Sequence, residues 1–189
     1  MISHKLHKPG KTVVAFSPET LEKIHELIRH YPDGQQKSAL LPVLHIAQEE
    51  LGGFLSADLM DYIASLLYIQ PIEVYEVATF YSMFNIDPVG KFVIDVCRTG
   101  PCAICGGEDI MDYLKKKLNI NEGETTPDGL FTINAVECLG ACGAAPVMQV
   151  NTEFHEFLTS EKIDILLDNL REMANEKKVS QSRWVEKFF

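Results

Sequence analysis

The sequence has no hydrophobic run near the roughly 20 residues that a membrane-spanning helix requires, so we expect no membrane span. Basic residues are scarce: 17 Lys and Arg stand against 27 Asp and Glu, which gives a net charge of −10. Because nucleic-acid binding depends on clustered Lys and Arg, this balance argues against a nucleic-acid partner. The N-terminus has neither a secretory h-region nor an arginine-rich transit pattern, so we expect a reducing, cytoplasmic compartment.

Two sequence patterns that would indicate other chemistry are also missing. No Gly-x-Gly-x-x-Gly run follows a predicted strand, and Cys105-Gly106-Gly107 does not supply one, so the chain lacks that dinucleotide-binding fingerprint. The five cysteines form an odd set in a chain of 189 residues. A disulfide framework is typical of small secreted chains with an even number of cysteines, so it is the weakest interpretation of these residues.

The chain is long enough for a real hydrophobic core. Of its 189 residues, 46% are hydrophobic and 23% charged, which suits one or two domains. We expect a flexible arm over residues 1–16 and a helical bundle over 17–88. A domain with both strands and helices follows over 89–175, and a polar tail over 176–189 completes an α+β chain.

Apolar residues at helical spacing predict the bundle's four helices. We expect these over residues 18–31, 36–51, 56–67 and 71–84, with Ser17 and Ser56 as N-caps and Pro42 in or near a first turn. The fourth helix carries an aromatic stripe that would either close the bundle or face a partner. The stripe consists of Tyr75, Phe80, Tyr81 and Phe84.

The second half reads as a βαββα domain. We expect strands over 92–96, 130–136 and 147–150, a short fourth strand at 157–158, and helices over 108–118 and from the Ser160 cap onward. In this order, Cys97 and Cys138 both follow strands that leave the same end of the sheet. Their sulfurs would therefore meet at that end.

All five cysteines lie between residues 95 and 150, as Cys97-x4-Cys102, Cys105 and Cys138-x3-Cys142. Structural zinc usually takes two Cys-x-x-Cys knuckles, whereas wider spacings such as Cys-x4-Cys are typical of iron–sulfur clusters held by four cysteines. The spacing therefore favours a cluster, with a zinc-stapled interaction module as an alternative.

Cys105 leaves two further interpretations open. Cys97, Cys102 and Cys105 match the plant-type ferredoxin run, while Cys102-x-x-Cys105 matches a thiol–disulfide oxidoreductase motif. Cys138 and Cys142 are most simply explained as the other half of a four-thiolate site. We therefore expect Cys105 to be a spare, small apolar residue at the head of the following helix.

The cysteine pattern resembles that of the thioredoxin-like [2Fe–2S] subunit of respiratory complex I, over about residues 17–170. Other segments resemble the same family, namely Leu44–Glu49 with Gly52-Gly53, Ala78–Phe84, Gly123–Gly129, Val136–Cys142 and Ala145-Pro146. The resemblance implies a helical bundle followed by a thioredoxin-like domain. By analogy with thioredoxin-like folds, Pro146 occupies a position that often holds a cis proline.

The resemblance implies that Cys97 and Cys102 hold one iron and that Cys138 and Cys142 hold the other. Cys105 is not a ligand position in the family's pattern. The chain would transfer electrons through one [2Fe–2S] cluster, next to a flavoprotein subunit that binds FMN and NADH. We therefore expect no NADH oxidation by this chain alone.

The expected assembly is complex I, at the cytoplasmic side of the membrane. Related subunits of NAD-linked hydrogenases or formate dehydrogenases are the alternative.

Overall fold

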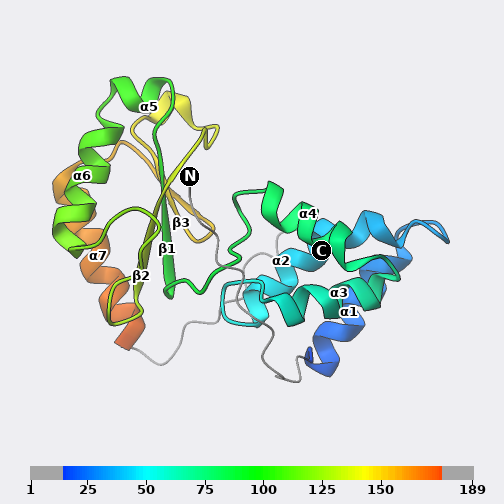
Figure 1. Cartoon of the computed structure of the whole chain (residues 1–189). Helices are drawn as coiled ribbons and strands as arrows, with labels where there is room; N and C mark the ends of the chain where they lie inside the picture. The colour runs from blue at the N-terminus through cyan, green and yellow to red at the C-terminus, as the bar shows by residue number, and fades with distance from the viewer. Residues whose placement is uncertain (1–14, 176–189) are drawn as a thin grey trace. The chain divides into compact units, whose positions relative to one another are not determined.

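The computed structural model describes residues 15–175, which divide after Pro88 into two compact units. We call residues 15–88 the helical unit and residues 89–175 the sheet unit, and describe each by itself (Figure 1). The combination of helices with a four-stranded sheet confirms the expected α+β class. The predicted tail 176–189 and residues 1–14 of the predicted arm lie outside the described residues.

The first helices of the helical unit begin where their N-caps predict. In α1 (Pro18–Arg29), the Ser17 hydroxyl accepts a hydrogen bond from the Thr20 amide at 3.2 Å. Phe16, which we expected at the end of the arm, is instead buried, and its ring centroid lies 5.4 Å from that of Tyr62. The hydrophobic core therefore begins before the first helix.

The next two helices also follow the sequence pattern closely. A 3₁₀ turn, η1 (Gln36–Ala39), leads into α2 (Leu40–Glu50), so Pro42 lies in the first turn of the α-helix. In α3 (Ala57–Leu67), the Ser56 hydroxyl accepts from the Leu59 amide at 3.3 Å. Both helices turn buried aliphatic side chains toward one core.

The fourth helix, α4 (Pro71–Phe80), is shorter than the expected 71–84. Tyr81 is already extended, with φ −92° and ψ 120°. The Gln48 side chain of α2 donates to the Met83 carbonyl at 3.0 Å and accepts from the Asn85 amide at 2.7 Å. Because the Gln48 side chain satisfies these backbone groups after Tyr81, the segment leaves the helix without losing their hydrogen bonds.

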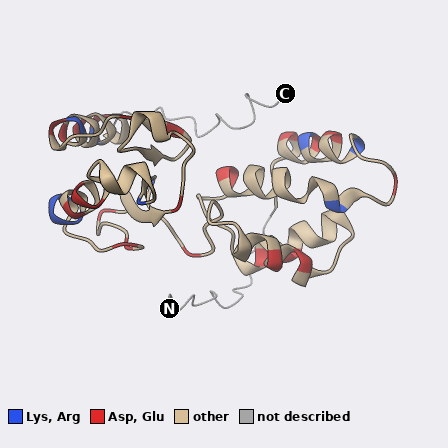
Figure 2. Cartoon of the chain, turned by 90° about the horizontal axis from the view of Figure 1, so that it is seen from above, with Lys and Arg blue, Asp and Glu red and all other residues tan. Residues whose placement is uncertain are grey.

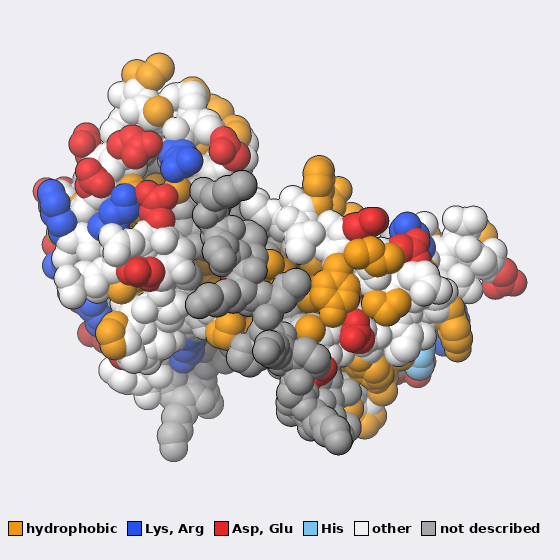
Figure 3. Space-filling model, viewed as in Figure 1, with side chains coloured by type: hydrophobic (Ala, Val, Ile, Leu, Met, Phe, Trp, Pro, Cys, Tyr) orange, Lys and Arg blue, Asp and Glu red, His pale blue; other side chains and the backbone are white. Residues whose placement is uncertain are grey.

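The expected aromatic stripe extends past the end of α4, and its side chains fall into two groups, one packed and one exposed. Phe84 is buried in the core, and the Tyr75 hydroxyl donates to Asp61 Oδ1 at 3.1 Å. Phe80 is 78% exposed and Tyr81 is 39% exposed, and Figure 3 shows hydrophobic side chains at the surface of the helical unit. Asp and Glu outnumber Lys and Arg on the same unit (Figure 2).

The sheet unit contains four strands in the order β2-β1-β3-β4. The strands are β1 (Phe92–Cys97), β2 (Phe131–Val136), β3 (Met148–Val150) and β4 (Glu153–His155). β1 and β2 are parallel, and the β1–β3 and β3–β4 pairs are antiparallel. Helices α6 (Gly107–Leu118) and α7 (Ser160–Asn175) lie on the same side of the sheet and share one apolar core with it (Figure 1).

Two details of the sheet unit differ from the expectation. The fourth strand is Glu153–His155 rather than 157–158, because Asn151, with φ +53°, begins a two-residue turn that pairs Val150 with Glu153. The cap of α7 is Thr159 rather than Ser160, since the Thr159 hydroxyl accepts from the Lys162 amide at 3.3 Å. The Ala145–Pro146 peptide bond is cis.

Candidate functional site

The sheet brings the two cysteine pairs to the same end. Cys97 is the last residue of β1 and stands opposite Val136, the last residue of β2. Cys138 follows β2 by two residues, and because β1 and β2 are parallel, both chains leave the sheet at the same edge. The expectation that both cysteine loops leave one end of the sheet is therefore confirmed.

The first pair, Cys97 and Cys102, is buried. The two residues are 3% and 2% exposed and form a small cluster with Val147. Cys102 lies in the short helix α5 (Pro101–Ile104), where its amide donates to the Thr99 carbonyl at 3.2 Å. The partly buried side chains around this cluster are Leu139, Ala141, Ala144 and Ala145.

The two buried thiols differ in acidity. Burial raises the pKa of Cys97, but hydrogen bonds to its sulfur from the Thr99 and Leu139 amides and from the Cys102 thiol outweigh burial, so its pKa lies below the usual value. Burial and the neighbouring Cys97 sulfur raise the pKa of Cys102, although the Val147 amide opposes this rise. Cys97 is therefore the better thiolate of the pair.

The second pair, Cys138 and Cys142, is exposed and already close together. Its two sulfurs are 3.9 Å apart, and the Gly140 amide donates to the Cys138 sulfur at 3.3 Å. Gly140 has φ +78°, a left-handed conformation that lets the loop between the two cysteines turn back. A tetrahedral metal with metal–sulfur bonds of about 2.3 Å separates two of its thiolates by about 3.8 Å, so this pair is spaced as the ligands of one metal.

The two pairs also interact with each other. Helix α5, which carries Cys102, lies against the 3₁₀ turn η2 (Cys142–Ala144). The pKa of Cys142 is raised first by the adjacent Cys138 and further by the charge of Cys97, and the charge of Cys142 contributes to raising the pKa of Cys102. The sulfurs of Cys97, Cys102, Cys138 and Cys142 therefore lie close enough to influence one another's charge, and they form one site made of two pairs.

Within residues 15–175, no group of three or more Cys, His, Asp or Glu side chains is placed so that it could hold a metal ion. The donor set instead consists of two thiolate pairs from separate loops, which fits a centre with two metal ions and two ligands on each. The residues present thus fit a [2Fe–2S] cluster.

Cys105 lies between helices α5 and α6. It is the C-cap of α5, two residues before α6 begins at Gly107, and it is exposed, while its expected role as a spare beside the other four cysteines stays a prediction. Helix α5 ends one residue earlier, at Ile104, which is 89% exposed.

Several hydrogen-bond donors at the site are backbone amides that sequence patterns did not reveal. The amides of Thr99, Leu139 and Val147 all donate to cysteine sulfurs. Every residue except proline carries such an N–H group, so side-chain identity gives no signal for it. The Gly140 amide, inside the Cys-x3-Cys loop, is a further backbone donor to a cysteine sulfur.

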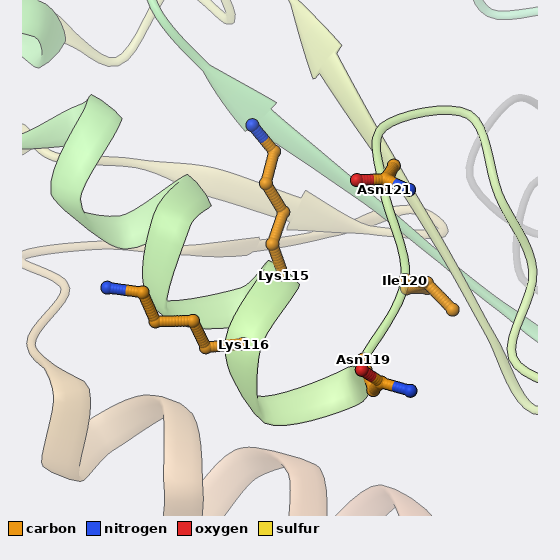
Figure 4. Close-up of a pocket in the computed structure, with 5 residues that line it drawn as sticks. All are labelled: Lys115, Lys116, Asn119, Ile120 and Asn121. Atoms are coloured by element: carbon orange, nitrogen blue, oxygen red, sulfur yellow. The ribbon is translucent and has the colours of Figure 1, made fainter.

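A cavity of about 270 Å³ lies at the far end of α6 from these cysteines (Figure 4). Lys115, Lys116, Asn119, Ile120 and Asn121 line it. The Lys115 ammonium is paired with Glu122 at 2.9 Å, and the lining supplies no thiol, imidazole or carboxylate. This cavity therefore lacks the donors that a metal cluster requires.

In the described part of the chain, no helix is both long and apolar enough to cross a membrane.

Comparison with known proteins identifies the family to which this chain belongs. The family model of the thioredoxin-like [2Fe–2S] ferredoxins matches residues 24–171. The chain is 44% identical over 160 residues to an NADH-quinone oxidoreductase subunit of Rickettsia bellii, covering 85% of this chain and 96% of the relative. It is 44% identical over 156 residues to the mitochondrial NADH dehydrogenase [ubiquinone] flavoprotein 2 of Dictyostelium discoideum, covering 82% of this chain and 63% of that protein.

A solved structure shares the fold at lower identity. A chain of a crystallised NAD⁺-reducing [NiFe]-hydrogenase in the H₂-reduced state aligns with a TM-score of 0.63 and 21% identity. The alignment covers 77% of this chain and only 23% of the hydrogenase chain. At this identity the likeness concerns the fold alone.

Proposed function

Because the chain belongs to the thioredoxin-like [2Fe–2S] ferredoxin family, we propose that it is an electron-transfer subunit of an NADH:quinone oxidoreductase, the assembly known as complex I. In this proposal Cys97 and Cys102 hold one iron of the cluster, and Cys138 and Cys142 hold the other. The observation that carries the proposal is the meeting of the two cysteine pairs at one end of the sheet. The 44% identity to a relative that is matched over 96% of its length supports the choice of assembly.

When bound, a [2Fe–2S] cluster supplies reversible one-electron transfer. The chain's own residues prepare the site for the negative charge of four thiolates. Amides of Thr99, Leu139 and Gly140 donate to the sulfurs of Cys97 and Cys138, and such donors stabilise the charged form.

The two pairs differ in their access to solvent. Burial against Val147 excludes water from Cys97 and Cys102, whereas Cys138 and Cys142 are exposed at the surface.

The proposed partner is the flavoprotein subunit that binds FMN and NADH. Two large exposed side chains next to the cysteines offer it an apolar surface. Ile104 in α5 is 89% exposed, and Phe157, whose amide donates to the Ala144 carbonyl of η2 at 2.8 Å, is 56% exposed. In this division of labour the flavoprotein oxidises NADH, and this chain receives single electrons at the cytoplasmic face of the membrane-bound assembly.

A role in an NAD-linked hydrogenase or formate dehydrogenase is the runner-up. The solved hydrogenase shares the fold at 21% identity, while the Rickettsia NADH-quinone oxidoreductase relative is 44% identical. The larger identity over nearly the whole relative favours complex I as the assembly. Co-purification of the native complex decides between these assemblies.

The experiment that tests the proposed function loads the full-length chain with iron and sulfide and records its visible absorption before and after reduction. We expect a coloured protein that bleaches on reduction. Serine at Cys97, Cys102, Cys138 or Cys142 should abolish or distort this spectrum, and Cys105→Ser, the matched control, should leave it largely intact.

Other outcomes identify the alternatives. A normal spectrum from Cys138→Ser, or a colourless Cys105→Ser chain, would overturn the ligand assignment. A colourless wild-type chain that binds zinc, or that exchanges disulfides through Cys102 and Cys105, would replace the proposal with one of the other two chemistries. NADH turnover by the purified chain without a flavoprotein would refute the division of labour.

A further inference from the structure

Gly107, the first residue of α6, is buried in direct contact with the backbone of two cysteines. A Cβ atom added to it would lie 2.9 Å from the carbonyl oxygens of both Cys97 and Cys102, and 3.2 Å from the carbonyl carbon of Cys102. Carbon and oxygen atoms without a bond between them pack at a larger separation than this. Because both neighbours are backbone atoms, no side-chain rotation can relieve the contact.

Backbone conformation does not explain the glycine at this position. The preceding Gly106 has φ +97°, which favours glycine, whereas Gly107 has no left-handed φ and any residue could adopt its backbone conformation. The lack of free space is therefore what requires glycine here. A close approach of one backbone to another is a recognised reason for glycine.

The two carbonyls belong to separate segments of the chain. Cys97 ends strand β1, and Cys102 lies in helix α5, while Gly107 opens the next helix. A single added Cβ in the first turn of α6 would thus meet the backbones of both cysteines of the buried pair.

We propose that Gly107 is a positioning residue, whose missing side chain lets α6 hold the backbones of Cys97 and Cys102 at the separation that metal binding by this pair uses. The inference rests on the proposed function, since it concerns the iron assigned to that pair. The substitution Gly107→Ala would push the backbones of Cys97 and Cys102 away from α6, so that their sulfurs no longer hold the positions that metal binding requires. The aliphatic side chains of the sheet unit's core, which do not include Gly107, would remain packed.

Two other glycines provide matched controls. Gly90 is equally crowded, because a Cβ there would lie 2.9 Å from backbone atoms of Leu130 and Phe131, but it precedes β1 at the opposite end from Cys97. Gly143 lies directly after Cys142, and a Cβ there would meet nothing within 4 Å. Gly90→Ala therefore reproduces the steric clash away from the site, and Gly143→Ala places a methyl group at the site without a clash.

The test compares full-length wild-type, Gly107→Ala, Gly90→Ala and Gly143→Ala chains loaded with iron and sulfide. We expect Gly107→Ala to lose iron to a chelator at least about tenfold faster than either control, the size of effect seen when groups that support metal ligands are altered. The electron paramagnetic resonance spectrum of its reduced form should also change, while those of the controls match the wild type. Cooperative unfolding of the metal-free Gly107→Ala chain, followed by circular dichroism, should resemble that of Gly90→Ala.

Three results overturn the inference. One is chelation at the same rate in all four chains, and another is an unchanged resonance spectrum in Gly107→Ala. The third is a metal-free Gly107→Ala chain whose unfolding transition is broader than that of Gly90→Ala or missing, since its clash would then damage the framework rather than the cysteine pair. A wild-type chain that assembles no iron–sulfur chromophore is a separate outcome, because it removes the proposed function before Gly107 is tested.

Discussion

Asn151, in the turn between β3 and β4, offers a quantitative test of how the strand that carries Cys97 is held. Its side-chain oxygen accepts from the Val93 amide at 2.9 Å, its side-chain nitrogen donates to the Lys91 carbonyl at 3.3 Å, and its φ is +53°. One side chain therefore ties the start of β1 to the β3–β4 turn while adopting a left-handed backbone.

Replacing Asn151 with Ala removes both side-chain hydrogen bonds. It also forces alanine, which tolerates the left-handed backbone conformation less well than asparagine, to adopt a positive φ. Two exposed hydrogen bonds contribute about 1–2 kcal/mol together, and the left-handed backbone costs alanine about 1 kcal/mol. We expect Asn151→Ala to lower the free energy of unfolding by about 2–3 kcal/mol, which corresponds to a 30- to 150-fold change at roughly 1.4 kcal/mol per factor of ten. Asn151→Gly loses the same hydrogen bonds but tolerates the positive φ, so it should be less destabilised than Asn151→Ala.

Hydrogen exchange of the Cys97 amide, which donates to the Val147 carbonyl at 3.1 Å and keeps this partner in both variants, is the suitable assay. It reports the sheet unit directly, and a chain with two compact units need not unfold in a single step. Protection of this amide should fall in the order wild type, Asn151→Gly, Asn151→Ala. Equal protection in all three chains, or a glycine variant weaker than the alanine variant, would refute the assignment of the two contributions.

Two further predictions concern titration in the helical unit. Burial and the hydrogen bond to Asp61 raise the pKa of Tyr75 to about 12. An ultraviolet titration should therefore show one tyrosine that ionises at unusually high pH. This ionisation step should vanish in Tyr75→Phe and move to lower pH in Asp61→Asn. Burial lowers the pKa of His45 below its usual value, so the unfolded chain binds this proton more readily than the folded one. Unfolding free energies should therefore be highest above about pH 6.5 and fall as the pH drops below it, and a slope unchanged in His45→Leu would assign the effect to other groups.

Much of the fold could be predicted because local chemistry and tertiary packing agree. Ser17 and Ser56 cap the helices they precede, and the parallel pairing of β1 with β2 places Cys97 and the Cys138 loop at one end of the sheet. The spacing of the cysteines alone predicted two pairs, Cys97 with Cys102 and Cys138 with Cys142, and the structure brings these two pairs together.

The features that could not be predicted depend on long-range contacts. The end of α4 at Phe80 depends on the Gln48 side chain, which is far from it in the sequence. The place of β4 depends on the turn at Asn151, whose side chain is bonded to Val93 and Lys91 at the start of β1. The role of Gly107 depends on two carbonyls from other segments, and no residue pattern near position 107 indicates such a contact.

X-ray absorption spectroscopy at the iron edge of the loaded, full-length chain tests the central claim most directly. Four cysteine ligands on two irons predict iron surrounded by sulfur alone, with a second iron at short range. Nitrogen or oxygen in the first coordination shell, or the absence of an iron–iron contribution, would contradict the assignment of Cys97, Cys102, Cys138 and Cys142 to a [2Fe–2S] cluster.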